Sequence, residues 1–141
     1  MAKRLYIIIA LVVIPYILMA QKNKADDLIG YYYSVDPFSG EESQTYIYKN
    51  AEGKYDGSVC WVSNVKKKHF LGFVFLKGLT FNEKDNEWQG GTVQYPGKSG
   101  TYKMYMKFEG PKKLKVRGYW GFAMLGKSMY WYKEDQKREQ K

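Results

Sequence analysis

The chain has little of the two residue types that most often build metal centres and nucleophilic active sites, because its 141 residues include one cysteine and one histidine. With Cys60 alone no internal disulfide can form, so a hydrophobic core has to supply the stability. With His69 alone neither a histidine metal cluster nor a histidine-based triad can form. We expect His69, which follows three lysines, in an exposed loop. Cys60 lies in the alternating run Ser58–Val62 without a base to activate it, and we expect an inert thiol.

Acidic residues are also scarce, with 14 aspartates and glutamates against 23 lysines and arginines, so the formal net charge is +9. The carboxylates lie mainly in turns, as at Asp36, Glu52 and Asp85, and nothing in the sequence pairs them for general acid and base catalysis. We therefore expect no enzyme, and neither a cofactor nor a metal. The lysines are spread over hairpins and chain ends, which argues against nucleic acid as a partner. Weak attraction to anionic membranes or cell-wall polymers is the alternative.

The longest apolar run lies at the N-terminus, where Lys3 and Arg4 precede the segment 5–20, which is interrupted only by Pro15. Basic residues, an apolar stretch and a small residue before polar ones are the three parts of a secretory signal. The run is shorter than the roughly 20 apolar residues of a membrane-spanning helix. We expect cleavage between Ala20 and Gln21; an uncleaved membrane anchor and a cut a few residues further on are the alternatives. Cleavage leaves 121 residues (141 − 20) with a charge of +7 (21 − 14), which suits one domain without a stable membrane anchor.

Aromatic residues are abundant: fourteen tyrosines, seven phenylalanines and four tryptophans make up 18% of the chain. Such residues favour β-strands and bury a large area each. Short alternating segments are separated by turn signals such as Pro96–Gly97 and Gly110–Pro111. The clearest is Tyr102–Phe108, in which an apolar set that must face inward alternates with lysines. These patterns predict strands at 29–35, 44–50, 55–63, 70–82, 87–95, 102–108, 113–121 and 127–133.

Antiparallel strands joined mostly by tight turns hide their edges most simply by closing into a barrel. We therefore predict an all-β fold, an eight-stranded antiparallel up-and-down barrel after an N-terminal signal peptide. The expected organisation is a signal peptide at 1–20, a short linker at 21–26, the barrel domain at 27–133 and a charged C-terminal tail at 134–141. A barrel of this size is either filled by side chains or holds one small ligand.

The segment Leu114–Trp131, with the sequence LKVRGYWGFAMLGKSMYW, resembles the C-terminal signature of a bacterial family of exported proteins known only as a domain of unknown function. The stretch Trp88–Val93 is similar to a second motif of that family, and the resemblance covers about residues 27–133. It implies a lipocalin-like barrel and supplies no established activity. The sequence departs from the family at Tyr32, where tryptophan is usual, and at Tyr95, where aspartate is frequent.

Inward-facing apolar and aromatic side chains are the candidates for a ligand pocket inside the barrel, with the Tyr102 hydroxyl orienting the ligand. The alternative for the same residues is a plain filled core. The pocket candidates are Phe73, Phe75, Tyr102, Met104, Met106, Trp120 and Trp131.

Arg117 is a candidate for a structural cap. It alternates with Val116 and so points outward with Lys115, which leaves a bidentate contact with a ligand carboxylate as the less favoured alternative. In lipocalin-like barrels an arginine late in the chain commonly stacks over the aromatic residue of a Gly-x-Trp motif in the first strand, which here is Gly30–Tyr32. By this resemblance we expect Arg117 to form a cation–π cap on Tyr32.

Together these patterns predict an exported, non-enzymatic barrel protein, periplasmic or secreted, that binds a small hydrophobic or amphipathic ligand in its interior without transforming it. The alternative is a cell-envelope interaction module whose basic, tyrosine-rich exterior contacts a protein or polysaccharide. A continuous cavity on the order of several hundred Å³ would favour the first. A filled interior with an exposed aromatic patch would favour the second.

Overall fold

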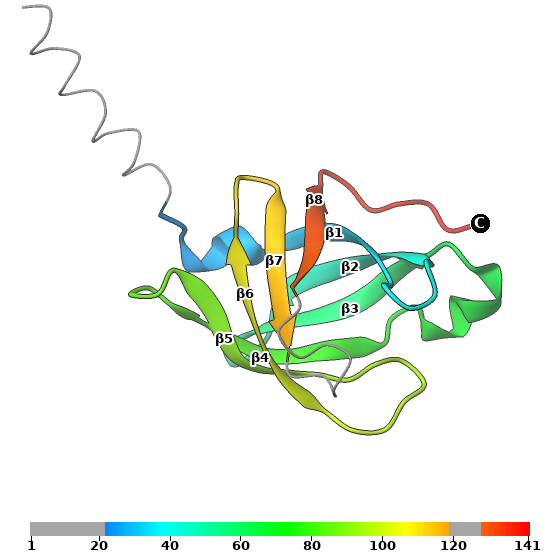
Figure 1. Ribbon diagram of the computed structural model, residues 1–141, viewed down its shortest axis with the longest axis horizontal. Helices are drawn as coiled ribbons and strands as arrows, with labels where there is room; N and C mark the ends of the chain where they lie inside the picture. The colour runs from blue at the N-terminus through cyan, green and yellow to red at the C-terminus, as the bar shows by residue number, and fades with distance from the viewer. Residues whose placement is uncertain (1–21, 119–127) are drawn as a thin grey trace, which may run out of the picture.

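The protein folds as a closed antiparallel β-barrel in a computed structural model that describes residues 22–118 and 128–141. Each strand pairs with the next along the chain, and β8 pairs with β1 to close the ring (Figure 1). The predicted eight-stranded up-and-down barrel is confirmed. The strands are β1 Gly30–Val35, β2 Glu42–Lys49, β3 Tyr55–Val62, β4 Val74–Asn82, β5 Glu87–Val93, β6 Tyr102–Phe108, β7 Lys113–Gly118 and β8 Met129–Glu134. Two short 3-10 helices accompany them, η1 Ala25–Leu28 and η2 Val65–Phe70.

The expected signal peptide lies outside the described residues. Within the described part of the chain, none of the helices has the length and apolar character needed to cross a membrane.

Alternation along the strands places the core inside the barrel. In β6, Met104 and Met106 are buried, whereas Lys103 and Lys107 on the other face are exposed. The buried cluster draws residues from every strand and from η1, so the interior is one continuous core.

β4 buries more residues than strict alternation allows. Leu76 and Leu79 are fully buried, and Phe75 and Phe81 pack against the same core. The pattern breaks because the register with β3 shifts twice and Gly78 has a φ of +76°, as in a β-bulge. The strand begins at residue 74 rather than at the predicted 70, because residues 65–70 form η2 in place of the expected loop.

η1 closes one end of the barrel. Leu28 is fully buried against the core. Trp88 and Tyr32 each donate a hydrogen bond to a backbone carbonyl oxygen of η1, over 3.0 and 2.7 Å. The Tyr55 hydroxyl donates to the Asp26 carboxylate over 2.5 Å. These contacts fix η1 to β1, β3 and β5, so this end of the barrel is sealed.

The residues after β8 run along the outside of the barrel towards the end opposite η1 (Figure 1). Gln44, buried on β2, donates to the Gln136 carbonyl oxygen over 3.0 Å and accepts from the Arg138 backbone N–H over 2.9 Å. The Gln140 side chain forms two hydrogen bonds with the backbone of Val62, of 2.9 and 3.0 Å. We call residues 135–141 the C-terminal strap, because these bonds hold the expected charged tail against the barrel.

Candidate functional site

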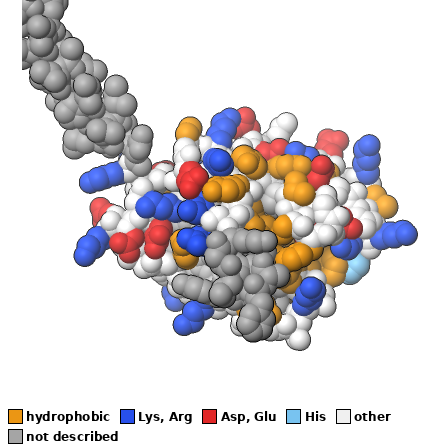
Figure 2. All heavy atoms as spheres, viewed as in Figure 1, with side chains coloured by type: hydrophobic (Ala, Val, Ile, Leu, Met, Phe, Trp, Pro, Cys, Tyr) orange, Lys and Arg blue, Asp and Glu red, His pale blue; other side chains and the backbone are white. Residues whose placement is uncertain are grey.

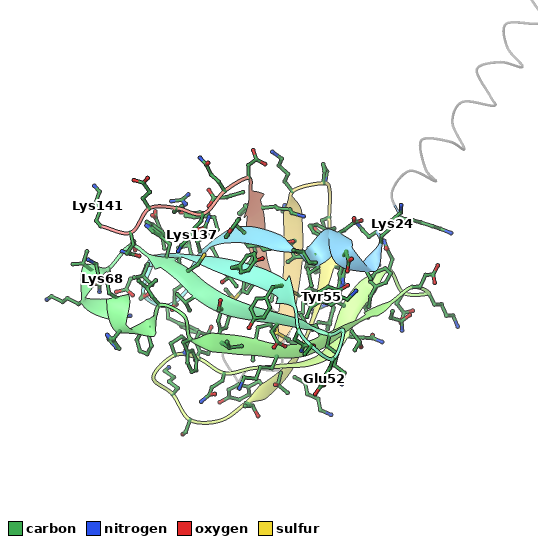
Figure 3. The ribbon with its side chains drawn as sticks, turned by 180° about the vertical axis from the view of Figure 1, so that it is seen from behind. Lys24, Glu52, Tyr55, Lys68, Lys137 and Lys141 are labelled. Carbon is green, nitrogen blue, oxygen red and sulfur yellow. The ribbon has the colours of Figure 1, made fainter. Side chains whose placement is uncertain are left out.

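The end of the barrel opposite η1 opens into a cavity of about 170 Å³. The β1–β2 loop, η2 and the β5–β6 loop surround its mouth, on the right in Figure 1. Figure 3, seen from behind, shows Lys68 of η2 at the mouth end and Lys24 and Tyr55 at the closed end. The wall of the cavity is largely apolar. Its apolar lining includes Val59, Val62, Phe70, Phe75, Val93 and Met129.

Three side chains with polar atoms are the most buried of their kind in the lining of the cavity. Ser34, Thr45 and Trp131 are 8%, 2% and 4% exposed and all line the cavity. The Ser34 hydroxyl already shares a hydrogen bond of 3.3 Å with the Ser43 hydroxyl. The otherwise apolar wall therefore carries a few buried polar groups.

Trp131 carries the distinctive feature of this site. Its ring packs against Phe75 and Tyr32, with ring centroids 6.1 and 6.4 Å apart. Its indole Nε1–H is buried and has no hydrogen-bond partner among the described residues. A buried donor without an acceptor costs about 1–3 kcal/mol. The site therefore holds a donor that an acceptor on a bound molecule could satisfy.

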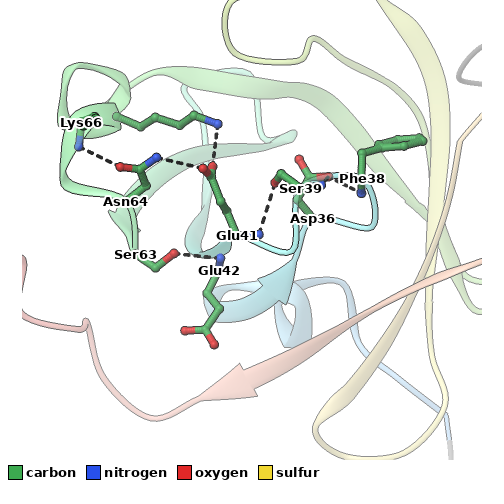
Figure 4. Close-up of polar contacts among 9 residues, drawn as sticks. Asp36, Phe38, Ser39, Glu41, Glu42, Ser63, Asn64 and Lys66 are labelled. Atoms are coloured by element: carbon green, nitrogen blue, oxygen red, sulfur yellow. Dashed lines mark hydrogen bonds and ion pairs between the residues drawn. The ribbon is translucent and has the colours of Figure 1, made fainter.

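Polar contacts tie η2 to the β1–β2 loop at the mouth (Figure 4). The Lys67 ammonium and the Asn64 amide both donate to the Glu41 carboxylate, over 2.5 and 2.8 Å. These two hydrogen bonds, that from Lys67 first, hold the pKa of Glu41 below its ordinary value. The Glu42 backbone N–H donates to the Ser63 hydroxyl over 2.9 Å. The rim of the mouth is thus held in one geometry.

The seven predicted pocket residues lie in different surroundings. Phe75 and Trp131 line the cavity. Met104 and Met106 belong to the buried core, and Tyr102 packs against it. Phe73 is half-buried just before β4, and Trp120 lies outside the described residues.

Most residues that line the cavity were not among the predicted ones, and Ser34, Thr45 and Tyr95 are examples that carry hydroxyl groups. Ser34 follows Tyr32 by two positions on β1, so alternation alone could have placed it inside. Tyr95 lies in the β5–β6 loop, because β5 ends at Val93 and not at the predicted residue 95. Burial, and then the charge of Asp36, raises the pKa of Tyr95 well above its ordinary value, so its phenol stays neutral.

The cation over Tyr32 is Lys133, where we expected Arg117. The Lys133 ammonium lies 5.9 Å from the centroid of the Tyr32 ring and 5.7 Å from that of Phe108, and donates to the Asp27 carbonyl oxygen over 2.7 Å. Burial lowers the pKa of Lys133. The cation comes from β8 because β8 is the strand that pairs with β1. Arg117 lies on β7, on the face opposite the buried side chains of Leu114 and Val116.

Cys60 and His69 are not among the residues that line the cavity. The Cys60 thiol lies 3.3 and 3.2 Å from the backbone and side-chain oxygens of Gln44, and burial raises its pKa to about 11. His69 is exposed and packs on Phe70, with ring centroids 4.2 Å apart. Among the residues that the structure describes, no three histidine, cysteine or acidic side chains gather as metal ligands would.

Comparisons with known proteins agree with this fold. The solved structure of protein HP1028 from Helicobacter pylori, described as belonging to the lipocalin family, matches with a TM-score of 0.61 and 18% identity, over 77% of this chain and 84% of that chain. At this identity the likeness concerns the fold alone, which is lipocalin-like. No curated protein matches the chain significantly. The family model described as an uncharacterized protein conserved in bacteria (DUF2147) matches residues 30–133. Since this match spans most of the chain, the protein belongs to the DUF2147 family of bacterial proteins.

Proposed function

We propose that the barrel binds a small, neutral amphipathic molecule at its mouth, without transforming it. The observation that carries this proposal is the buried Nε1–H of Trp131, which lines the cavity and has no hydrogen-bond partner in the described part of the chain. A ligand with an oxygen acceptor at this position would remove the cost of the unpaired donor. The apolar wall would take up the rest of the ligand.

The volume of the cavity limits the size of this ligand. About 170 Å³ is below the roughly 300 Å³ at which pockets for drug-sized molecules begin. It is close to the about 150 Å³ of an engineered cavity that holds benzene. A single ring or a short chain with one polar group therefore fits inside, and a longer ligand would extend through the mouth.

The charges of the lining favour a neutral acceptor. Lys67 is the only cation among the described lining residues, and it is paired with Glu41 at the rim. A carboxylate beside Trp131 would be buried without a counter-ion, which is costly. A carbonyl, hydroxyl or ether oxygen is therefore the better partner for the indole. With the secretory signal expected at 1–20, we propose that this binding takes place in the periplasm or outside the cell.

A matched pair of probes tests the proposal. Acetophenone and α-methylstyrene have the same shape and differ only in a carbonyl oxygen that replaces a methylene group. Ligands of this size bind with dissociation constants on the order of 0.1–1 mM, which calorimetry can measure at high protein concentration. α-Methylstyrene is the more apolar probe and leaves water more readily, so the affinity ratio of the two probes is compared between the unaltered protein and Trp131→Phe. We expect the preference for acetophenone over α-methylstyrene to be about 2- to 12-fold higher in the unaltered protein, the range that corresponds to about 0.5–1.5 kcal/mol for one hydrogen bond.

Trp131→Phe is the reference for this ratio because its donor is gone. The same ratio in both proteins, or no binding of either probe to the unaltered protein, would contradict the proposal. Native mass spectrometry of protein purified from its own host, before and after denaturation, would then identify the natural ligand as a mass lost on unfolding.

A second candidate function rests on the outer face of β6, β7 and β8. Lys107 lies directly opposite Lys115, whose ammonium also lies 3.6 Å from the Glu109 carboxylate, so two cations share one carboxylate here. The Lys113 ammonium lies 4.4 Å from the centroid of the Tyr130 ring, and Tyr132 is 47% exposed. Figure 2 shows Lys and Arg side chains mixed with hydrophobic ones on this face. An acidic polysaccharide would neutralise the lysines, and its sugar rings would stack on the tyrosines.

Affinity electrophoresis in gels containing polygalacturonate, an acidic polysaccharide, or dextran, a neutral one, tests this second candidate. We expect retardation by polygalacturonate that is lost in the variant with Lys107→Gln and Lys115→Gln. The same variant should bind acetophenone as the unaltered protein does, because neither lysine lines the cavity. Equal retardation by both polymers would rule the candidate out.

A further inference from the structure

Exposed apolar side chains gather at the mouth of the barrel. Among the described residues, four large hydrophobic side chains are exposed, and three of them surround this mouth. Val35 (45% exposed) ends β1 and lines the cavity, Phe38 (63%) lies in the β1–β2 loop, and Val65 (55%) begins η2. Figure 4 shows Phe38 turned away from the polar contacts of its loop. The fourth, Tyr132, lies on β8. We call Val35, Phe38 and Val65 the apolar rim.

Lysines accompany the apolar rim. Lys66 and Lys68 follow Val65 in η2, and both are exposed without an ion pair among the described residues. Figure 3 shows Lys68 at the outer margin of this end. Lys98, in the β5–β6 loop, is exposed as well, and its ammonium lies 5.9 Å from the centroid of the Tyr95 ring. Three cations therefore surround the apolar rim.

Two carboxylates near the mouth, those of Asp36 and Glu41, accept hydrogen bonds within the protein. Asp36 accepts hydrogen bonds from the backbone N–H groups of Phe38 and Ser39, over 2.7 and 3.3 Å. Glu41 is held by Lys67 and Asn64. Around the mouth, Asp36, Glu41 and Glu42 contribute three negative charges, and Lys66, Lys67, Lys68 and Lys98 contribute four positive ones. The net charge that the rim offers to a partner is therefore positive (4 − 3 = +1).

We propose that the apolar rim and its lysines dock the mouth of the barrel onto an anionic lipid bilayer. Single apolar side chains on separate loops suit shallow insertion between lipid headgroups, and the lysine stems can extend along the lipids while their ammonium groups meet lipid phosphates. In this orientation the cavity faces the bilayer. This inference rests on the proposed function. With the mouth docked on the bilayer, the amphipathic ligand could pass between the lipid and the cavity without crossing water.

Co-sedimentation with vesicles tests the docking. The mature protein, residues 21–141, is mixed with vesicles of phosphatidylcholine alone or with about one third phosphatidylglycerol. Each lysine near an anionic surface adds roughly fivefold to binding, so the variant with Lys66→Gln and Lys68→Gln should bind the anionic vesicles about 25-fold less. The variant with Phe38→Ser and Val65→Ser should lose at least tenfold on the same vesicles. All variants carry the same N-terminus, so their differences report on the rim.

Matched controls come from the outer wall of the barrel on β7 and β8. Tyr132→Ser removes an equally exposed apolar side chain, and Lys113→Gln with Lys115→Gln removes two cations from β7; both should bind vesicles within twofold of the unaltered protein. Circular dichroism before and after heating checks that every variant is folded. The inference is overturned if the rim variants bind as the unaltered protein does, if the β7 variant loses binding instead, or if phosphatidylcholine alone binds equally well.

The acetophenone titration separates this inference from the proposed function. Phe38, Val65, Lys66 and Lys68 do not line the cavity, so the rim variants should bind acetophenone with unchanged affinity. Vesicle binding that fails while acetophenone binding persists overturns the docking alone. A rim variant that loses both would also overturn it, because the rim would then be part of the ligand site.

Discussion

Two buried tryptophans allow the cost of the unpaired indole to be measured. Trp88 and Trp131 are 0% and 4% exposed, and both belong to the same core. The Nε1–H of Trp88 donates to the Ala25 carbonyl oxygen over 3.0 Å, whereas that of Trp131 has no partner among the described residues. Replacing each by phenylalanine removes the same atoms. The two variants should therefore differ in unfolding free energy mainly because Trp88→Phe breaks an indole hydrogen bond and Trp131→Phe does not.

The expected magnitudes follow from these contacts. The smaller ring costs about 2 kcal/mol at either site, at about 0.8 kcal/mol for each buried carbon lost. Trp88→Phe also leaves a carbonyl oxygen of η1 without its donor, which adds about 1–2 kcal/mol. Trp131→Phe instead removes an unpaired donor and regains about 1–3 kcal/mol. We expect Trp88→Phe to lower the free energy of unfolding by about 3–4 kcal/mol and Trp131→Phe to change it by about 1 kcal/mol or less, in either direction.

Urea unfolding followed by far-ultraviolet circular dichroism measures both values. The protein should first be unfolded and refolded, to remove any molecule bound from the host. The dependence of the unfolding free energy on urea should be equal in both variants, so that a shift of the midpoint reports stability. Equal destabilisation by the two substitutions would refute the reasoning, because the Trp131 donor would then be satisfied in the empty protein, for example by water.

Three further predictions concern other parts of the barrel. Because burial raises the pKa of Cys60 from 9.0 to about 11, iodoacetamide at pH 8 should alkylate the native thiol about 100-fold more slowly than the urea-unfolded one, as followed by mass spectrometry; equal rates would contradict this. Hydrogen bonds from Tyr55 and then Lys49 hold the pKa of Asp26 in the folded protein below its ordinary value. The ionised carboxylate therefore stabilises the fold at any pH above the pKa that Asp26 has in the unfolded chain. This stabilisation is lost as the pH falls through the lower pKa of the folded protein. Tyr55→Phe should therefore lower the melting temperature at pH 7 and have less effect near pH 2, and an equal effect at both would be evidence against it. Gly91→Ala would place a methyl carbon 2.8 Å from Leu79 and 2.9 Å from the Lys77 carbonyl oxygen, and should cost about 1–3 kcal/mol of unfolding free energy; Gly57→Ala, whose nearest neighbours are side-chain atoms at 3.1 Å or more, should cost less.

The barrel could be predicted because its evidence is local. A strand such as β6 shows its inner and outer faces in the sequence itself, since Met104 and Met106 alternate with lysines. Tight turns between such strands leave few topologies that cover every edge. η1 has no such signal, because a single turn of helix is too short to show a period, and its place depends on Trp88, Tyr32 and Tyr55 from distant strands.

The cavity could be predicted only in part, because it depends on which inward residues meet at one level of the barrel. Phe75 and Trp131 were found from their aromatic character. Ser34 and Thr45 escaped notice because small polar residues do not stand out among the aromatic ones. The cation over Tyr32 shows the same limit. Its identity depends on the register of β8 against β1, which places Lys133 directly opposite Tyr32, and the alternation within either strand does not give that register.

During synthesis, β1 has to wait for its last partner strand, β8. Tyr31 of β1 pairs with Glu134 of β8, which is 103 residues (134 − 31) further along the chain. At about 5–20 residues per second, synthesis of that stretch takes about 5–20 s. Through that interval one edge of β1, rich in tyrosine, has no strand beside it and can pair with any other chain. A newly made copy is therefore most exposed to aggregation before its last strand emerges, and a chaperone that covers the first strand would be most effective in that interval.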